Sequence, residues 1–121
     1  MALSVLLDSV ILIDHLNGVS DATRYLESLT DASISVITRA EVLAGFAPAD
    51  LSAVKEWLDR YPTFVIDRAT GDLAAELRQR FKWKLPDALQ AAVAQRNGLK
   101  LATRNTKNFP PQRFSFVVVP Y

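Results

Sequence analysis

Short apolar runs alternate with longer segments of helical periodicity along this chain, and this alternation constrains the fold more than any other feature. The strand candidates are the apolar runs 4–7, 33–36, 63–66, 99–102 and 115–119. Helices are predicted over 9–16, 21–29, 39–46, 51–60, 69–81 and 87–97, with Asn97-Gly98 as the stop signal of the last one. Strands that alternate with helices form a parallel sheet covered on both faces, so the pattern predicts a three-layer α/β/α domain.

Length and composition fit one compact domain over residues 1–121. Half of the residues are hydrophobic, which is enough for a core that needs no stabilising cross-links. The absence of cysteine excludes disulfides and thiolate metal sites. The apolar segment 1–7 has no basic residue before it, and Asp8 and Asp14 interrupt the apolar stretch that continues from it. We therefore interpret it as a buried strand rather than a signal peptide or membrane span, and expect a cytoplasmic protein.

Charge is distributed unevenly, although the net charge is only +1. Residues 1–60 hold four Lys/Arg against nine Asp/Glu, whereas residues 61–121 hold ten against four. Between Arg78 and Arg113 there are nine basic residues and one acid, Asp87. A basic stretch around one isolated carboxylate indicates a polyanion held near an acidic centre, and an ordinary solvated face is the competing interpretation.

Three carboxylates fall on predicted strand-to-helix junctions. Asp8 follows the first strand, Glu41 follows the second, and Asp87 opens the last helix. Each also has an ordinary structural interpretation when taken alone. Asp8 can cap a helix, Thr38-x-x-Glu41 is a capping box, and an acid after Pro86 suits the first turn of a helix.

The position of these three acids relative to the sheet favours a functional interpretation. In open α/β sheets, ligands bind at the carboxyl edge, and a strand order of 3-2-1-4-5 would bring Asp8, Glu41 and Asp87 together there. Carboxylates that lie close together repel one another, and a hard divalent ion such as Mg²⁺ or Mn²⁺ would offset that repulsion. Such an ion activates water and neutralises charge on a phosphoryl oxygen, so phosphodiester hydrolysis is the predicted reaction class.

Four motifs carry a family resemblance. They are LDSVILI at 7–13, SVITRAEVLAG at 35–45, LPDALQAA at 85–92 and LATRNTKNF at 101–109. In this order and spacing they resemble the PIN-domain family, and within it the VapC toxins of toxin–antitoxin pairs. The resemblance spans nearly the whole chain.

This resemblance implies a Mg²⁺- or Mn²⁺-dependent endoribonuclease. Asp8, Glu41 and Asp87 would bind the metal, and the hydroxyl groups of Ser9 and Thr103 would support the site through hydrogen bonds. The resemblance also implies a homodimer and a cognate antitoxin whose C-terminal segment blocks the active groove. No membrane partner is expected.

The last motif departs from the family. A fourth acid is common at the position of Asn105 or Asn108, and this chain has amides at both. An amide oxygen ligates a metal or its water without adding negative charge, so we expect one ion, with Asn105 and Asn108 completing its coordination shell. Turn chemistry after the fourth strand is the competing interpretation of both residues.

Arg39, Arg104 and Lys107 lie within or beside the acidic motifs, and we expect them to contact RNA phosphates. Asp14 is expected to be a solvated acid. A catalytically weak PIN domain that acts mainly as an antitoxin- or RNA-binding module is the main alternative. A receiver-like domain would need a lysine after its last strand, where this chain has Pro120, and we set it aside.

Overall fold

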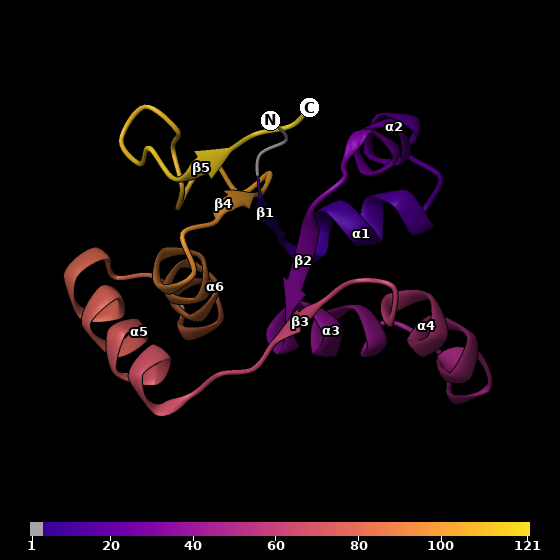
Figure 1. Ribbon diagram of the computed structural model, residues 1–121, viewed down its shortest axis with the longest axis horizontal. Coiled ribbons are helices and arrows are strands. Elements are labelled where there is room, and N and C mark those ends of the chain that lie inside the picture. The colour runs from indigo at the N-terminus through magenta and orange to yellow at the C-terminus, as the bar shows by residue number, and fades with distance from the viewer. Residues whose placement is uncertain (1–3) are drawn as a thin grey trace.

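A computed structural model of the protein describes residues 4–121, so the first part of the predicted segment 1–7 lies outside the described residues. The five strands are β1 (Val5–Leu7), β2 (Ala32–Ser35), β3 (Thr63–Phe64), β4 (Lys100–Ala102) and β5 (Val117–Val118). All neighbours pair in parallel, in the order β3-β2-β1-β4-β5 (Figure 1). The predicted order is therefore confirmed, with β1 in the centre.

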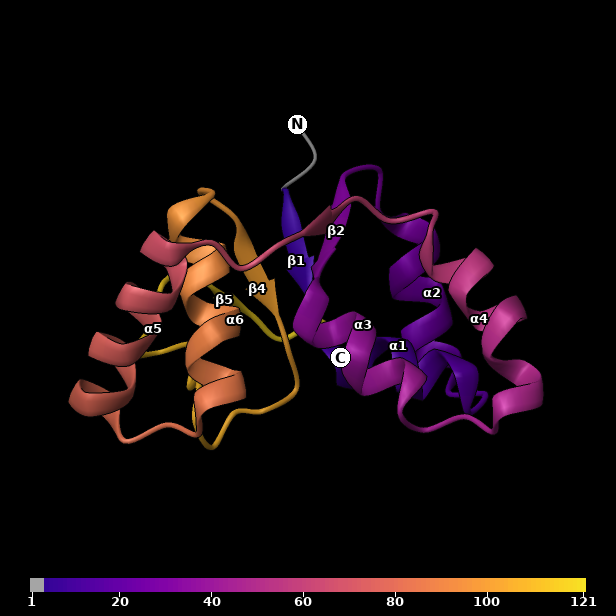
Figure 2. The same ribbon diagram turned by 90° about the horizontal axis from the view of Figure 1, so that it is seen from below.

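Six α-helices connect and cover these strands. They are α1 (Ser9–Leu16), α2 (Ser20–Ser28), α3 (Val36–Leu43), α4 (Leu51–Leu58), α5 (Arg68–Phe81) and α6 (Leu85–Arg96), with a 3₁₀ turn over Pro48–Asp50. Figure 2 shows α5 and α6 together on one side of β1, and α1 to α4 on the other. This is the predicted three-layer arrangement. Within residues 4–121, no helix has both the length and the apolar character needed to cross a membrane.

The hydrophobic core has two parts because side chains alternate along the central strand. Leu6 packs into a cluster with residues of α5 and α6. Its neighbours Val5 and Leu7 pack into a second cluster with residues of α1, α3 and α4. All three strand residues are buried, as expected for a parallel strand covered on both faces.

The start of α3 corrects one prediction. The helix was expected over 39–46 but begins at Val36, because the Ser35 hydroxyl accepts a hydrogen bond from the Thr38 backbone N–H at 3.2 Å and caps it. The Thr38-x-x-Glu41 capping box is therefore wrong. Thr38 is the third residue of the helix and Glu41 the sixth, so Glu41 has no capping role.

The other boundaries agree with the predictions to within a few residues. Helix α1 spans the predicted range, and α6 begins two residues early, at Leu85, with Pro86 in its first turn. It ends at Arg96, and Gly98 adopts the left-handed φ of 64° that the stop signal predicted. Strands β3 and β5, which form the two edges of the sheet, are shorter than predicted.

Candidate active site

Asp8 lies at the carboxyl end of the central strand, where β1 passes into α1. Its backbone N–H donates to the Ala102 carbonyl at 2.9 Å, which attaches it to β4. Its Oδ1 accepts from the Ser9 backbone N–H at 2.8 Å, and its Oδ2 accepts from the Thr103 hydroxyl at 2.7 Å. Asp8 is only 8% exposed. Asp8 is thus both a helix cap and a buried carboxylate fixed in one orientation.

Gln90 connects this carboxylate to the neighbouring junction. Its side-chain N–H donates to the Thr38 hydroxyl at 2.6 Å and approaches Asp8 Oδ1 at 3.4 Å, and its carbonyl accepts from the Ser35 hydroxyl at 2.6 Å. Thr38 in turn donates to the Leu7 carbonyl at 3.0 Å. The direction of every bond is determined, because each hydroxyl has one proton to donate. One amide on α6 therefore holds the ends of β1 and β2 together.

Sequence reasoning missed Gln90 as a site residue, although a signal was present. It is 2% exposed and stands in the stretch 88–94, where every other residue is alanine, leucine or valine. A helix that is apolar on all faces is buried, and a buried amide must find hydrogen-bond partners. A lone glutamine in such a helix therefore predicts a polar network at that position.

The charges of the three predicted acids act on one another, which indicates that the acids lie near one another. Burial raises the pKa of Glu41, a hydrogen bond with Ser9 lowers it, and the charges of Asp8 and Asp87 raise it again. Burial also raises the pKa of Asp87; a hydrogen bond from Asn108 lowers it and the charge of Asp8 raises it. Among residues 4–121, none of the three acids forms an ion pair. The acids at the edge of the sheet thus have no ion-pair partner in the described part of the chain, although the charge of Lys84 acts on Asp87 from a longer distance.

The donor set suits a hydrated hard cation better than a closed metal cage. In the described range 4–121, no three Asp, Glu or His side chains are close enough together to hold one ion among them. Mg²⁺ does not require such a cluster, since it usually keeps several waters and takes one or two carboxylates. The groups at this edge present oxygen atoms and no histidine nitrogen or thiolate, which favours Mg²⁺ or Mn²⁺ over zinc.

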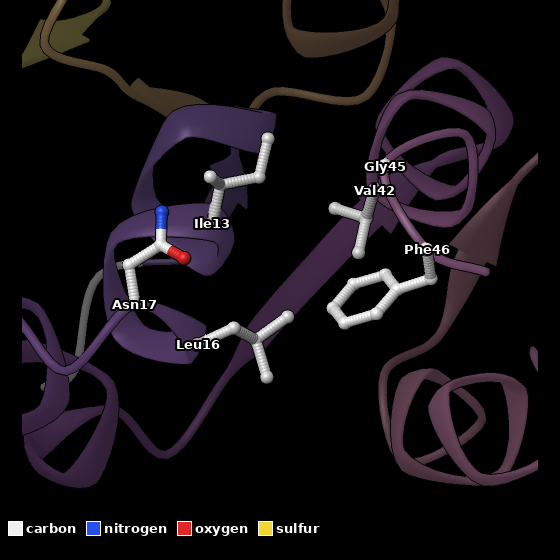
Figure 3. A pocket seen from close by; sticks show the side chains of 6 residues that line it. All are labelled: Ile13, Leu16, Asn17, Val42, Gly45 and Phe46. Carbon is white, nitrogen blue, oxygen red and sulfur yellow. The ribbon is translucent and has the colours of Figure 1, made fainter. Parts of the chain in front are cut away.

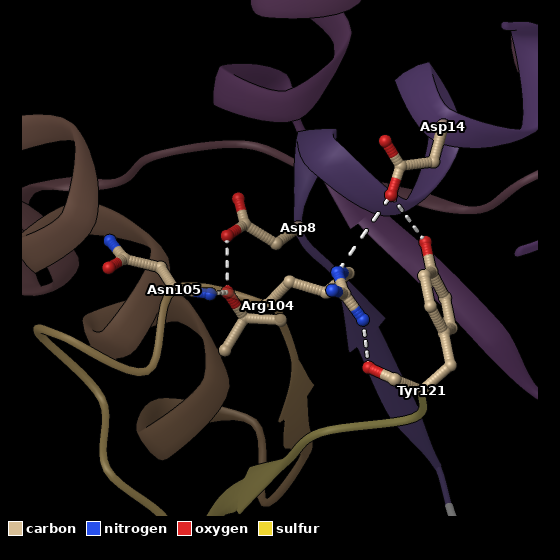
Figure 4. A network of polar contacts seen from close by, with 6 residues as sticks. Asp8, Asp14, Arg104, Asn105 and Tyr121 are labelled. Atoms are coloured by element: carbon tan, nitrogen blue, oxygen red, sulfur yellow. Dashed lines mark hydrogen bonds and ion pairs between the residues drawn. The ribbon is translucent and has the colours of Figure 1, made fainter. Parts of the chain in front are cut away.

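The two amides take different positions around this site. The Asn108 side-chain N–H donates to Asp87 Oδ2 at 2.8 Å. Asn105 accepts from the Asn108 backbone N–H at 3.3 Å through its side chain, and its own N–H donates to the Thr103 hydroxyl at 3.0 Å. In Figure 4 the Asn105 amide points away from Asp8. The hydrogen bonds of Asn105 thus stabilise the turn after β4. Asn108 instead places an N–H donor next to Asp87, where a carboxylate would repel it.

Arg39 does not lie free at the site. It forms an ion pair with Asp59 at 2.9 Å, on the side of the molecule that carries α4. Lys107 is exposed, and within residues 4–121 it has no carboxylate partner. Of these two residues predicted to contact phosphates, only Lys107 has a charge that no acid within residues 4–121 pairs with.

Arg104 belongs to a second polar network, which the sequence did not reveal. Its guanidinium lies 4.5 Å from the centre of the Tyr121 ring, contacts the Tyr121 carbonyl and approaches Asp14 at 4.0 Å (Figure 4). The Tyr121 hydroxyl donates to Asp14 at 2.9 Å; burial first, and then this bond, raise the pKa of the phenol. Asp14 is therefore a partner of the 104–121 region rather than a solvated acid.

An apolar hollow lies between the C-terminal ends of α1 and α3. Its volume is about 210 Å³, and its lining residues are Ile13, Leu16, Asn17, Val42, Gly45 and Phe46 (Figure 3). No carboxylate lines it, and Leu16 is 38% exposed. The hollow is thus suited to an apolar side chain of another molecule and not to catalysis.

Comparison with known proteins agrees with this architecture. The model of the PIN domain family matches residues 5–111. The chain is 36% identical over 114 residues to Ribonuclease VapC10 of Mycobacterium tuberculosis, covering 88% of this chain and 86% of that protein.

Solved structures give the same result. A toxin–antitoxin complex from Klebsiella pneumoniae holds a chain that is 37% identical, with a TM-score of 0.90 and 98% of both chains covered. The FitAcB structure from Neisseria gonorrhoeae matches with a TM-score of 0.79 at 24% identity, over 96% of this chain and 97% of that one, and shows the shared fold. This chain therefore belongs to the PIN-domain family, and to the VapC group within it.

Proposed function

We propose that this protein is an endoribonuclease toxin that hydrolyses RNA phosphodiester bonds with the help of Mg²⁺ or Mn²⁺. The observation that carries the proposal is the Asp8 carboxylate, buried at the carboxyl edge of the sheet and oriented by Thr103. Glu41 and Asp87 are close enough for their charges to interact with it. The similarity to a ribonuclease of the VapC group supports RNA as the substrate.

Different residues of the chain would bind the ion, orient its ligands and accept a proton. Asp8, Asp87 and Glu41 would hold the ion, directly or through its waters, with Ser9 and Thr103 orienting their oxygens. When bound, the ion would lower the pKa of a water and neutralise charge on the phosphoryl group. Glu41 reaches solvent although its carboxylate is partly desolvated by its surroundings, which raise its pKa, so this carboxylate would suit the acceptance of a proton from that water.

A cognate antitoxin is the proposed protein partner, because the 37% identical chain was solved in a toxin–antitoxin complex. The apolar hollow between α1 and α3 offers a site for an apolar side chain of that partner. A homodimer and a single domain over residues 1–121 remain parts of the proposal; the continuous five-stranded sheet supports the single domain.

A catalytically weak module that binds antitoxin or RNA remains the second candidate. Two observations favour it: amides stand at both Asn105 and Asn108, and no three acids within residues 4–121 are close enough to hold one ion. The variants below separate the two candidates.

Asp8→Asn should reduce divalent-dependent RNA cleavage on the order of 100-fold or more, because it removes the fixed negative charge while the amide can still cap α1. The measurement is cleavage of a labelled RNA with Mn²⁺ or Mg²⁺, with circular dichroism as the check on folding. Asp21→Asn, which changes an exposed acid of α2, is the matched control. Full activity of Asp8→Asn would rule out the mechanism.

Gln90→Met should weaken Mn²⁺ binding by about 10- to 100-fold, as loss of a group that orients a metal ligand commonly does. It should also cost about 1–3 kcal/mol of unfolding free energy, because the Ser35 donor and Thr38 acceptor lose their partner. Titration calorimetry and urea unfolding provide the two measurements, and Gln95→Met, exposed on the same helix, is the control. A loss of stability with unchanged Mn²⁺ affinity would show that Gln90 is structural only.

Raising the pH should lower the stability of the metal-free protein and increase the stabilisation by a bound metal ion. The pKa values of Glu41 and Asp87 are raised in the folded state. In the metal-free protein, the two protonated groups therefore add to the free energy of unfolding at low pH, and this added stability is lost as the pH rises through their folded-state pKa values. Mn²⁺ binds the ionised carboxylates, so it should raise the melting temperature at about pH 7.5 and have little effect at about pH 4. Equal effects at the two pH values would contradict a site built on these acids.

Asn108→Asp should lower the melting temperature of the metal-free protein, because it replaces a donor 2.8 Å from Asp87 with a second carboxylate. Cleavage by this variant should stay within about 3-fold of wild type if the native site is competent. Asn105→Asp, whose amide points away from Asp8, provides the comparison. A large gain in cleavage would favour the weak binding module instead.

A further inference from the structure

Six exposed cations lie at the C-terminal end of α5 and on the loops next to it. They are Arg78, Arg80, Lys82, Lys84, Lys107 and Arg113, named here the α5-end surface. In the region covered by residues 4–121, none of them forms an ion pair with a carboxylate. This distinguishes them from Arg39 and Arg104, whose guanidinium groups have acidic partners within the chain.

Hydrogen bonds connect this surface to the candidate active site. Arg78 donates to the Trp83 carbonyl at 2.8 Å, and the Trp83 indole N–H donates to the Asn108 carbonyl at 3.1 Å. Asn108 then donates to Asp87 at 2.8 Å. The charge of Lys84 lowers the pKa of Asp87, which places this cation near the acidic edge as well. The α5-end surface is therefore held in a defined position relative to the acids.

Two of the guanidinium groups are already oriented by aromatic rings. Arg80 lies 5.0 Å and Arg113 5.2 Å from the centre of the Phe81 ring, and Arg113 also lies 5.2 Å from that of Phe114. Stacking of this kind fixes the planar group and leaves its N–H edges free. A fixed guanidinium loses little conformational freedom when it binds a phosphate in a bidentate manner.

Lys82 occupies a backbone position that favours glycine. Its φ of 61° makes it the only non-glycine residue of 4–121 with positive φ, at the end of α5. Together with Arg78, Gln79 and Trp83 it lines a hollow of about 330 Å³. Lys82 thus places a cation beside this hollow from a backbone position that is strained for a residue with a side chain.

We propose that the α5-end surface binds the phosphate backbone of the RNA strand on one side of the cut site, with Lys82 contacting a phosphate at the hollow. The inference rests on the proposed ribonuclease function and specifies the side from which the substrate is held. The opposite side is unsuited to RNA, because around α2 and α4 it exposes five acids and two of its cations are already paired. The acids are Asp21, Glu27, Asp50, Glu56 and Asp59, and the paired cations are Arg24 and Arg39. RNA is therefore expected to extend from the acidic edge over α5 and not over α2 and α4.

The first test is metal-free binding of a labelled single-stranded RNA, measured by fluorescence anisotropy in EDTA so that cleavage cannot interfere. Arg80→Ala with Arg113→Ala should weaken binding at least about 10-fold and reduce the slope of log affinity against log salt by about 1.4. Arg24→Ala with Arg60→Ala removes the same charge from α2 and the turn after α4, and should change affinity less than about 2-fold. Equal losses in the two double variants would overturn the proposal, because affinity would then follow net charge alone.

Lys82→Gly supplies a test that a folding defect cannot imitate. Glycine relieves the left-handed strain, so the melting temperature should rise, while RNA affinity should fall by about 3- to 10-fold. Unchanged affinity in this variant would overturn the role of Lys82. Selective RNA binding without any metal-dependent cleavage by wild type would refute the proposed enzyme and leave this surface assignment intact.

Discussion

The amide of Gln90 and the hydroxyl of Thr38 form the interaction on which the rest of this structure depends. A parallel sheet ends in a row of junctions whose polar groups face a crowded interior, and each of these groups needs a partner. Gln90 supplies a donor to Thr38 and an acceptor to Ser35, and so joins the ends of β1 and β2 to α6. In the described residues, no buried side-chain polar atom is left without a partner.

This network fixes a carboxylate at the centre of the edge, and none of the residues from 4 to 121 forms an ion pair with it. Burial, together with the charges of neighbouring acids, raises the pKa values of Glu41 and Asp87, so ionisation of these two groups is less favourable than in water. A bound cation would relieve this repulsion. The repulsion at the edge is thus a property of the folded chain, and it is consistent with the proposed divalent ion.

The two halves of the molecule differ in what they offer to partners. The side with α1 and α3 carries an apolar hollow, and its cations Arg39 and Arg104 have acidic partners. The side with α5 carries exposed cations without such partners in the described range 4–121. This division fits a protein partner on one side and a polyanion on the other, and it follows from the uneven charge of the two halves of the sequence.

The sequence alone predicted the order of elements and the candidate acids, because hydrophobic periodicity and short motifs are local properties of the chain. The strand order 3-2-1-4-5 entered as a supposition about parallel α/β sheets, and the pairing of the strands in three dimensions confirmed it. The sequence did not reveal Gln90 as the connecting residue, nor the network of Asp14, Arg104 and Tyr121, since these contacts join residues 17 to 107 positions apart. It also misassigned the cap of α3, because Ser35 and Thr38 are both plausible caps and only the course of β2 selects between them. Tertiary structure decided which polar groups are buried together, and burial is what makes a hydrogen-bond partner obligatory.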